Sequence, residues 1–396
     1  MMRGQHPAVL ALAVAAFAIG MAEFIVVGVL PTIASDLGVT QDRAGALVSG
    51  YALALAVGTP MLMLTLSRFP PRRVLTGLMA LFLVGNLLAV IAQDFTSLMF
   101  GRVITAVAHG ALFALGATVA SRLAPQGQAG SAIALMFSGL TLAMVIGVPV
   151  GSLLGNGVGW RVPFVVIVVL ASMALVALWR WVPAHLDAQP TGSWREQLSA
   201  LGHPVIVVTM ALTAVGFGAT FPLFTYISLW LTEQSGFSTH IASGLLIVFG
   251  GATLVGNLMG GRMVGAMGWR RTAAWLLLGL AAILATIHAW GQISALMPIW
   301  LAVWGALAFG LSPAFQSGML ASAEQHRPRA VAFASALNIS SFNIGISAGS
   351  AAGSALVARE ALALTPLAGS GLAVLALGIL WLQGKVNRSR VVEAAA

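Results

Sequence analysis

The feature that most constrains this chain is a series of twelve long apolar segments, each close to the length needed to cross a lipid bilayer. A helix needs about 20 mostly apolar residues to span the hydrocarbon core. Short breaks rich in proline, glycine and arginine separate the segments, as expected of loops. The pattern predicts an all-α integral membrane protein with twelve transmembrane helices. The predicted spans are residues 8–30, 44–66, 74–92, 97–119, 131–154, 162–181, 205–231, 241–260, 272–290, 295–318, 331–356 and 367–384.

Composition excludes the soluble alternatives. The chain is 59% hydrophobic and only 7% charged, with a mean hydropathy of +0.97. A soluble domain carries about 25% charged residues and needs them at its surface. A soluble enzyme, a secreted disulfide scaffold and a disordered protein are therefore excluded. The chain also lacks cysteine, so it has no disulfide and no thiolate metal site. We expect neither a cofactor nor a bound metal.

The net charge of +9 is explained by membrane topology. If both termini lie on one side, that side collects fifteen of the basic residues and the opposite side collects three. The remaining one, Arg102, falls within the fourth span. Basic residues concentrate in cytoplasmic loops, so we expect both termini in the cytoplasm. The charge then predicts a multi-pass protein of a bacterial-type inner membrane, in contact with the lipid bilayer and without a nucleic-acid partner.

The chain repeats itself at an offset of 198 residues. The pair Arg72-Arg73 recurs as Arg270-Arg271. We predict two pseudo-symmetric six-helix bundles, residues 1–182 and 205–396, joined by a cytoplasmic linker at 183–204. Paired halves with a substrate site between them are common in secondary transporters, and duplicated halves make a monomer sufficient. The glycines that repeat at this offset are Gly147, Gly151 and Gly155, which map onto Gly345, Gly349 and Gly353.

Several short motifs carry a family resemblance. Span one holds Met21-Ala-Glu23-Phe before Pro31, and span four holds Gly101-Arg102 followed by His109-Gly110. Span five holds Gly147-Val-Pro149-Val-Gly151, and Gly159-Trp160-Arg161 follows it. Together these motifs resemble the major facilitator superfamily, in particular its twelve-span drug:proton antiporter branch and, within that, the arabinose and sugar-efflux permeases. The resemblance implies the major facilitator fold and transport by alternating access.

The cytoplasmic loop after span two departs from the family pattern. The family motif usually has an aspartate before its arginines, and that aspartate is implied to latch the cytoplasmic gate. Ser67 stands at this place, and Gly265 stands there in the second-half copy. A gating ion pair through that aspartate is therefore absent or replaced. The resemblance still implies gating or hinge roles for Arg68, Arg72, Arg73, Gly147, Pro149, Gly151, Arg262 and Arg270.

Glu23 is the one acid deep within a predicted span, about 12 Å below the outer end at 1.5 Å per residue. A carboxylate in hydrocarbon is costly, and desolvation favours its protonated form, as proton coupling requires. Arg102 and His109 are seven residues apart and share a helix face. We predict a proton-coupling column of Glu23, Arg102 and His109. A structural ion pair between Glu23 and Arg102 is the alternative, as is a His109 bonded to a neighbouring hydroxyl or backbone group.

The second half offers aromatic and amide side chains in place of a buried acid. Such a mixture is typical of pockets for small organic molecules. A single buried acid favours one proton per cycle and disfavours lipophilic cations as substrates. For each aromatic, packing or lipid contact is the alternative. The substrate-binding candidates are Phe24, Tyr51, Phe113, Phe137, Phe217, Phe221, Phe224, Trp304, Gln316, Asn338 and Phe342.

The sequence thus favours a proton-coupled secondary transporter that exports a small sugar-like, nucleoside-like or amphiphilic compound. A proton symporter or facilitator for uptake of a small metabolite is the alternative. A membrane-embedded enzyme is a distant one, because we find no buried pair of aspartates and no His-Glu-x-x-His motif.

Overall fold

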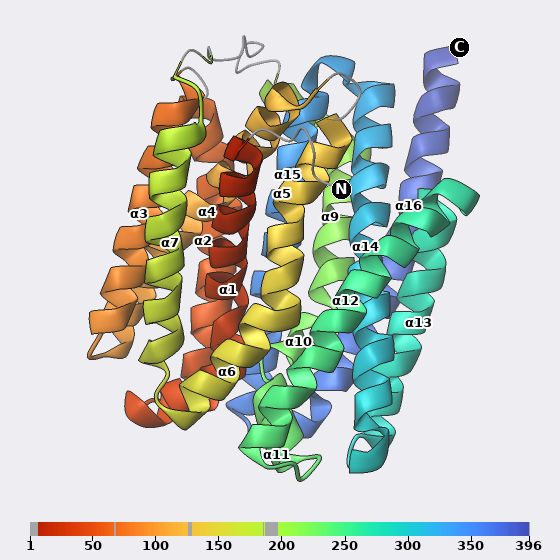
Figure 1. Ribbon diagram of the computed structural model, residues 1–396. Coiled ribbons are helices and arrows are strands. Elements are labelled where there is room, and N and C mark those ends of the chain that lie inside the picture. Colours follow the sequence, from red (N-terminus) through yellow and green to blue (C-terminus); the bar gives the residue numbers. More distant parts are fainter. Residues whose placement is uncertain (1–6, 67–68, 126–128, 185, 187–196, 396) are drawn as a thin grey trace. The chain divides into compact units, whose positions relative to one another are not determined.

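The computed structural model describes residues 7–66, 69–125, 129–184, 186 and 197–395, and within them the secondary structure is helical (Figure 1). Eleven helices in these ranges are long and apolar enough to cross a membrane. The twelfth expected span, residues 331–356, is the helix α15 (Val331–Val357), which is rich in serine, asparagine and glycine. The predicted all-α architecture of long apolar helices is confirmed.

The chain divides into two compact units. Unit 1 comprises Met1–Thr191 and Ser238–Gly250, and unit 2 comprises Gly192–Phe237 and Gly251–Ala396. The helix α12 (Thr239–Met267) contributes its first part to unit 1 and the remainder to unit 2. The division therefore falls inside one continuous helix, between two adjacent glycines.

Unit 1 is organised around its first helix. This helix is apolar on every side, buries twenty of its thirty residues, and packs against the second, fourth, fifth and sixth spans (Figure 1). A helix that is hydrophobic all round is expected at the centre of a bundle. The helices of unit 1 are α1 (Pro7–Asp36), α2 (Gln41–Leu66), α3 (Pro71–Ile91), α4 (Phe95–Leu123), α5 (Ala129–Leu142), η1 (Ala143–Gly147), α6 (Val148–Gly157) and α7 (Arg161–Trp181).

The fifth span is interrupted where the sequence predicted one continuous helix. The segment η1 is a π-helical turn, and it ends at Gly147, two residues before Pro149. Proline has no backbone N–H to donate to the preceding turn, and a wider π turn accommodates that loss. Beyond the proline, Gly151 faces Ile25 and Gly155 faces Val29, so α6 approaches α1 closely.

A polar cluster ties three helix ends of unit 1 together. Asp36, at the end of α1, accepts hydrogen bonds from Trp160 Nε1 at 2.8 Å and from Arg161 Nη1 at 2.7 Å. The other terminal nitrogen of Arg161 donates to the main-chain carbonyl of Ala92, just after α3, at 2.6 Å. The Trp-Arg motif found in the sequence thus links α1 and α3 to the start of α7.

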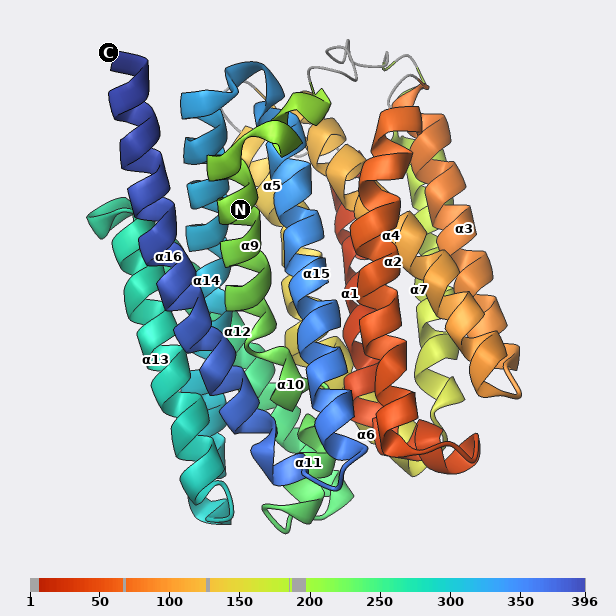
Figure 2. The ribbon, with the colours of Figure 1, turned by 180° about the vertical axis from the view of Figure 1, so that it is seen from behind.

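Unit 2 contains a broken seventh span, which Figure 2 shows as separate ribbons beside α15. Pro222 removes a donor near the first break. At the second break, Thr225 Oγ1 lies 2.8 Å from Ser350 Oγ. The elements of unit 2 are η2 (Ser199–Gly202), α9 (Pro204–Gly218), α10 (Phe221–Phe224), α11 (Ile227–Glu233), α13 (Trp269–Trp290), η3 (Ser294–Leu296), α14 (Met297–His326), η4 (Pro328–Ala330), α15, η5 (Leu362–Leu364) and α16 (Thr365–Ala395).

The repeated glycines make different contacts in the two units. In unit 1, a Cβ on Gly151 would meet the flexible side chain of Ile25. In unit 2, a Cβ on Gly349 would meet the carbonyl oxygen of Gly218. Small residues four apart let membrane helices approach closely, and in unit 2 the approach reaches main-chain contact. The glycines of α15 therefore hold the broken span in place.

We predict that Gly349→Ala destabilises the protein more than Gly151→Ala. The first change pushes two backbones apart and should cost about 1–3 kcal/mol, whereas the second is relieved by rotation of Ile25. Gly371→Ala is the control, because nothing lies within 4 Å of the added methyl group. Thermal melting of the three purified variants in one detergent gives the order of their stabilities. Equal melting temperatures for Gly349→Ala and Gly371→Ala would contradict it.

Candidate functional site

Arg102, on α4, is only 1% exposed. Its Nη1 donates to the main-chain carbonyl of Ala22, and its Nη2 donates to that of Glu23 at 3.3 Å. The guanidinium carbon lies 3.9 Å from the ring centroid of Tyr51. The Nε of Arg102 is buried without a hydrogen-bond partner. Two carbonyls and an aromatic face thus compensate a cation that is costly to keep in a membrane.

His109 joins the same group through a tyrosine. The hydroxyl of Tyr51 lies 3.0 Å from His109 Nδ1, and both side chains are buried. Because Arg102 and His109 are two turns apart on one face of α4, Tyr51 on α2 bridges the interval between them. Beyond His109, the row continues through the rings of Phe113 and Phe137. The ring centroids of His109 and Phe113 are 5.0 Å apart, and those of Phe113 and Phe137 are 5.4 Å apart.

Glu23 lies beside this row on α1, with a partly buried side chain. Arg102 contacts its main chain, and in the described part of the chain no ion pair joins the two side chains. The sequence did not predict that Tyr51 lies between Arg102 and His109. Tyr51 was predicted as a substrate-binding candidate instead. Phe24, the next residue on α1, is also buried.

In unit 2 the two predicted amides form a direct hydrogen bond. Asn338 Nδ2 donates to Gln316 Oε1 at 2.7 Å, and Asn338 Oδ1 accepts from Thr213 Oγ1 at 2.8 Å. Gln316 Nε2 in turn donates to Ser335 Oγ at 2.8 Å. We call these four residues the amide chain; it joins α9, α14 and α15. The two hydroxyl residues were missed, although Ser335 stands three residues before Asn338 and so shares its helix face.

The aromatic candidates of the second half form one cluster. Ring centroids are 4.8 Å apart for Phe217 and Phe342, and 5.7 Å apart for Phe217 and Phe221. Phe224 extends the cluster to Trp304 at 6.3 Å. Most of these rings are buried, and Phe342 is partly exposed. The cluster is therefore part of the core of unit 2 as well as a candidate lining for a substrate.

Comparison with protein families decides the identity of the fold. The family described as the Major Facilitator Superfamily matches residues 12–350. The chain belongs to this superfamily.

Individual relatives agree with this. The inner membrane transport protein YdhP of Escherichia coli K12 is 35% identical over 97% of this chain and 98% of its own. The putative transporter AraJ of the same organism is 34% identical over 67% of each chain. A chloramphenicol resistance protein of Streptomyces lividans is 33% identical over 92% of each. The crystal structure of a D-xylose-proton symporter shares the fold, with a TM-score of 0.73, 16% identity and coverage of 95% and 97%.

Two of the arginines in the family's loop motif, Arg72 and Arg270, contact residues of their own units. Arg72 lies over the ring of Trp179 at 5.8 Å. In unit 2, Arg270 donates to Gln383 Oε1 and to the Leu380 carbonyl on α16, the latter at 2.9 Å. Gln383 is almost fully buried and was missed, although an amide in an apolar span is itself a signal. Arg73 and Arg262 are exposed, whereas Arg68 lies outside the described residues.

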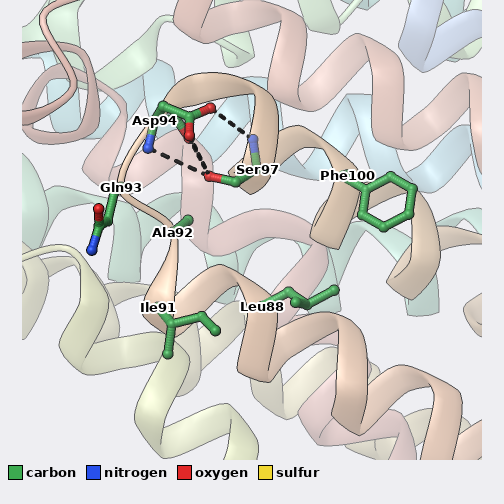
Figure 3. Close-up of a pocket in the computed structure, with 7 residues that line it drawn as sticks. All are labelled: Leu88, Ile91, Ala92, Gln93, Asp94, Ser97 and Phe100. Atoms are coloured by element: carbon green, nitrogen blue, oxygen red, sulfur yellow. Dashed lines mark hydrogen bonds between the residues drawn. The ribbon is translucent and has the colours of Figure 1, made fainter.

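A separate hollow of about 290 Å³ lies at the turn between α3 and α4 (Figure 3). Its apolar wall includes Ile91 and Phe100, and its polar side includes Asp94. Asp94 caps α4 by accepting the N–H groups of Thr96 at 2.8 Å and Ser97 at 3.0 Å. Its carboxylate is thus engaged in capping, and none of the predicted site residues lines this hollow.

The cap at α4 predicts a pH effect on stability. The backbone N–H of Ser97, with help from its hydroxyl and from Thr96, holds the pKa of Asp94 below its usual range. A lowered pKa contributes stability above the ordinary aspartate pKa of about 3.9, and that stability is lost as the pH falls through the lowered value. We expect Asp94→Ala to have a lower melting temperature than the wild type at neutral pH. The difference between the two melting temperatures should become smaller below about pH 4.

Asp94→Asn is the control for this effect. It keeps a capping oxygen without a charge, so its gap to the Asp94→Ala variant should not depend on pH. Melting curves of the three proteins between pH 7 and acidic pH measure both gaps. A wild-type gap that stays constant on acidification would refute the assigned role of the charge.

Proposed function

We propose that this protein is a proton-coupled secondary transporter that exports a small organic compound by alternating access. The observation that carries the proposal is the row of Glu23, Arg102, Tyr51 and His109 within unit 1. Among the described residues the Glu23 carboxyl group forms no ion pair, and an intramembrane carboxyl group of this kind can gain and lose a proton, which is the property that proton coupling requires.

The composition of each unit supports a division of labour. Unit 1 carries Glu23, while unit 2 carries the amide chain and the aromatic cluster. Amides bind neutral polar groups, and aromatic faces bind apolar ones, so unit 2 suits a neutral amphiphilic or sugar-like compound. We assign proton coupling to the first unit and much of the substrate contact to the second.

The remaining parts of the proposal concern placement. The distribution of basic residues supports the proposal that both termini lie in the cytoplasm and that the protein resides in a bacterial-type inner membrane. Because each unit contains its own half of the machinery, we propose that a monomer transports. The contacts of Arg72 and Arg270 within their own units suit gating or hinge roles for the loop arginines.

We predict that one of three ligands, L-arabinose, uridine or chloramphenicol, raises the melting temperature and does so more at pH 8 than at pH 6, whereas the lipophilic cation tetraphenylphosphonium does not. A ligand that binds only the folded state stabilises it by about 2.7 kcal/mol at a hundredfold excess over Kd. Stronger binding when Glu23 is deprotonated means that proton and ligand compete, as antiport requires. Detergent-purified protein suffices for the measurement.

Glu23→Gln provides the decisive comparison. Its ligand-induced shift should be the same at both pH values, and a ligand gradient should move no protons in proteoliposomes that contain it. Greater stabilisation of the wild type at pH 6 would favour symport. A wild-type proton flux that survives Glu23→Gln would overturn the assignment of the proton site.

A separate prediction tests the proposed substrate contact in unit 2. Asn338→Leu should abolish the ligand-induced shift and also lower the melting temperature without ligand, because a buried partner, Thr213, and a partly buried one, Gln316, lose hydrogen bonds, and each buried group left unpaired costs about 1–3 kcal/mol. Asn86→Leu is the matched control, since Asn86 is a buried amide of unit 1 bonded to the Phe82 carbonyl at 2.8 Å. It should lose stability but keep the ligand shift. Loss of the shift in both variants would argue against a substrate role for Asn338.

A further inference from the structure

We propose that Tyr51 is a positioning residue of the proton site. Its ring holds the Arg102 guanidinium away from the Glu23 carboxylate, and its hydroxyl fixes the orientation of His109. This inference rests on the proposed proton coupling through Glu23. It assigns Tyr51 to the residues that determine the pH at which Glu23 is protonated, in place of the substrate-binding residues.

The ring is the first part of the argument. The guanidinium carbon of Arg102 lies 3.9 Å from the Tyr51 ring centroid, a close cation–π contact in a site without exposure to water. The donors on the α1 side of the guanidinium reach the main-chain carbonyls of Ala22 and Glu23. With one face on the ring and two nitrogens on carbonyls, Arg102 is held beside Glu23 without pairing with its carboxylate.

The hydroxyl is the second part. A buried tyrosine hydroxyl needs a hydrogen-bond partner, and Tyr51 has His109 Nδ1 at 3.0 Å. This bond engages Nδ1 and leaves Nε2 as the nitrogen of His109 that can meet another group. The same side chain therefore acts on the cation through its ring and on the imidazole through its oxygen.

The surroundings of Glu23 make Arg102 the decisive charge. The helices packed against α1 are α2, α4, α5, α6 and α7, together with η1 and the first part of α12, whose Leu246 approaches Gly28. The one titratable residue in that part of α12 is His240, in its first turn. No residue of α5, η1 or α6 is titratable. The charged residues of α7 stand at its ends, and those of α2 stand in its first turn. In the middle of the bundle, Glu23 is thus faced by Arg102 and His109 of α4 and by Tyr51 of α2.

The distance between Arg102 and the Glu23 carboxylate consequently sets the proton affinity. An arginine that pairs with a carboxylate favours its charged form and lowers the pH of protonation by about one to three units. Without the ring, the guanidinium loses the contact that holds it on the α2 side. It then turns toward the nearest anion, which is Glu23. Removal of the ring should make Glu23 harder to protonate.

The test is an infrared pH titration of the carboxylic-acid C=O stretch in lipid nanodiscs, which needs no substrate. Glu23→Gln identifies the band by removing it. Tyr51→Phe keeps the ring and should titrate at the wild-type pH, whereas Tyr51→Leu and Tyr51→Met should titrate about one to three pH units lower. The matched control is Tyr226→Leu, which removes the other tyrosine of the chain.

The hydroxyl is tested by nitrogen NMR of the protein labelled at histidine. Tyr51→Phe should change the His109 Nδ1 resonance, assigned by its loss in His109→Gln, and Tyr226→Phe should leave it unchanged. An unchanged Nδ1 resonance in Tyr51→Phe would overturn the hydroxyl role. A titration in Tyr51→Leu and Tyr51→Met that matches the wild type would overturn the ring role while leaving proton coupling intact. Persistence of the band in Glu23→Gln would instead defeat the proposed proton site and this inference together.

Discussion

The structure of unit 1 depends on the compensation of one buried cation. Arg102 cannot be hydrated where it lies, so the neighbouring helices must supply what water would. The α1 backbone gives two carbonyls, and α2 gives an aromatic face. Because these partners come from different helices, they fix how α1, α2 and α4 stand against one another. A side chain proposed to take part in proton coupling thus also determines packing, and Glu23 is placed next to it as a result.

Interrupted helices raise a related problem, since a backbone break in hydrocarbon leaves polar groups without partners. The two units solve it differently. The fifth span widens into a π turn before Pro149, which keeps most of its hydrogen bonds within the segment. The seventh span breaks outright, and hydroxyl groups of α15, including that of Ser350, bond to the residues at the break. The serine and glycine content of α15 is therefore what its neighbour requires.

Hydrophobic segment length was enough to predict the fold, because a membrane allows few alternatives to spanning helices. Costly residues such as Glu23, Arg102 and Asn338 stood out in the sequence for the same reason. Contacts between helices were not predictable in this way. A tyrosine suits both a substrate and an arginine, and serines such as Ser335 are too common in spans to single out. The breaks of the seventh span also escaped prediction, since Pro222 is tolerated in many membrane helices without one.

The division of the chain inside α12 has a consequence for how the molecule is made. The linker between the halves looks like the natural place to separate them into two polypeptides. The segment Ser238–Gly250, however, belongs to unit 1 although it is encoded well after that linker. A ribosome therefore completes the first unit only after it has begun the second. The two halves share repeated motifs, but they are not independent products of synthesis.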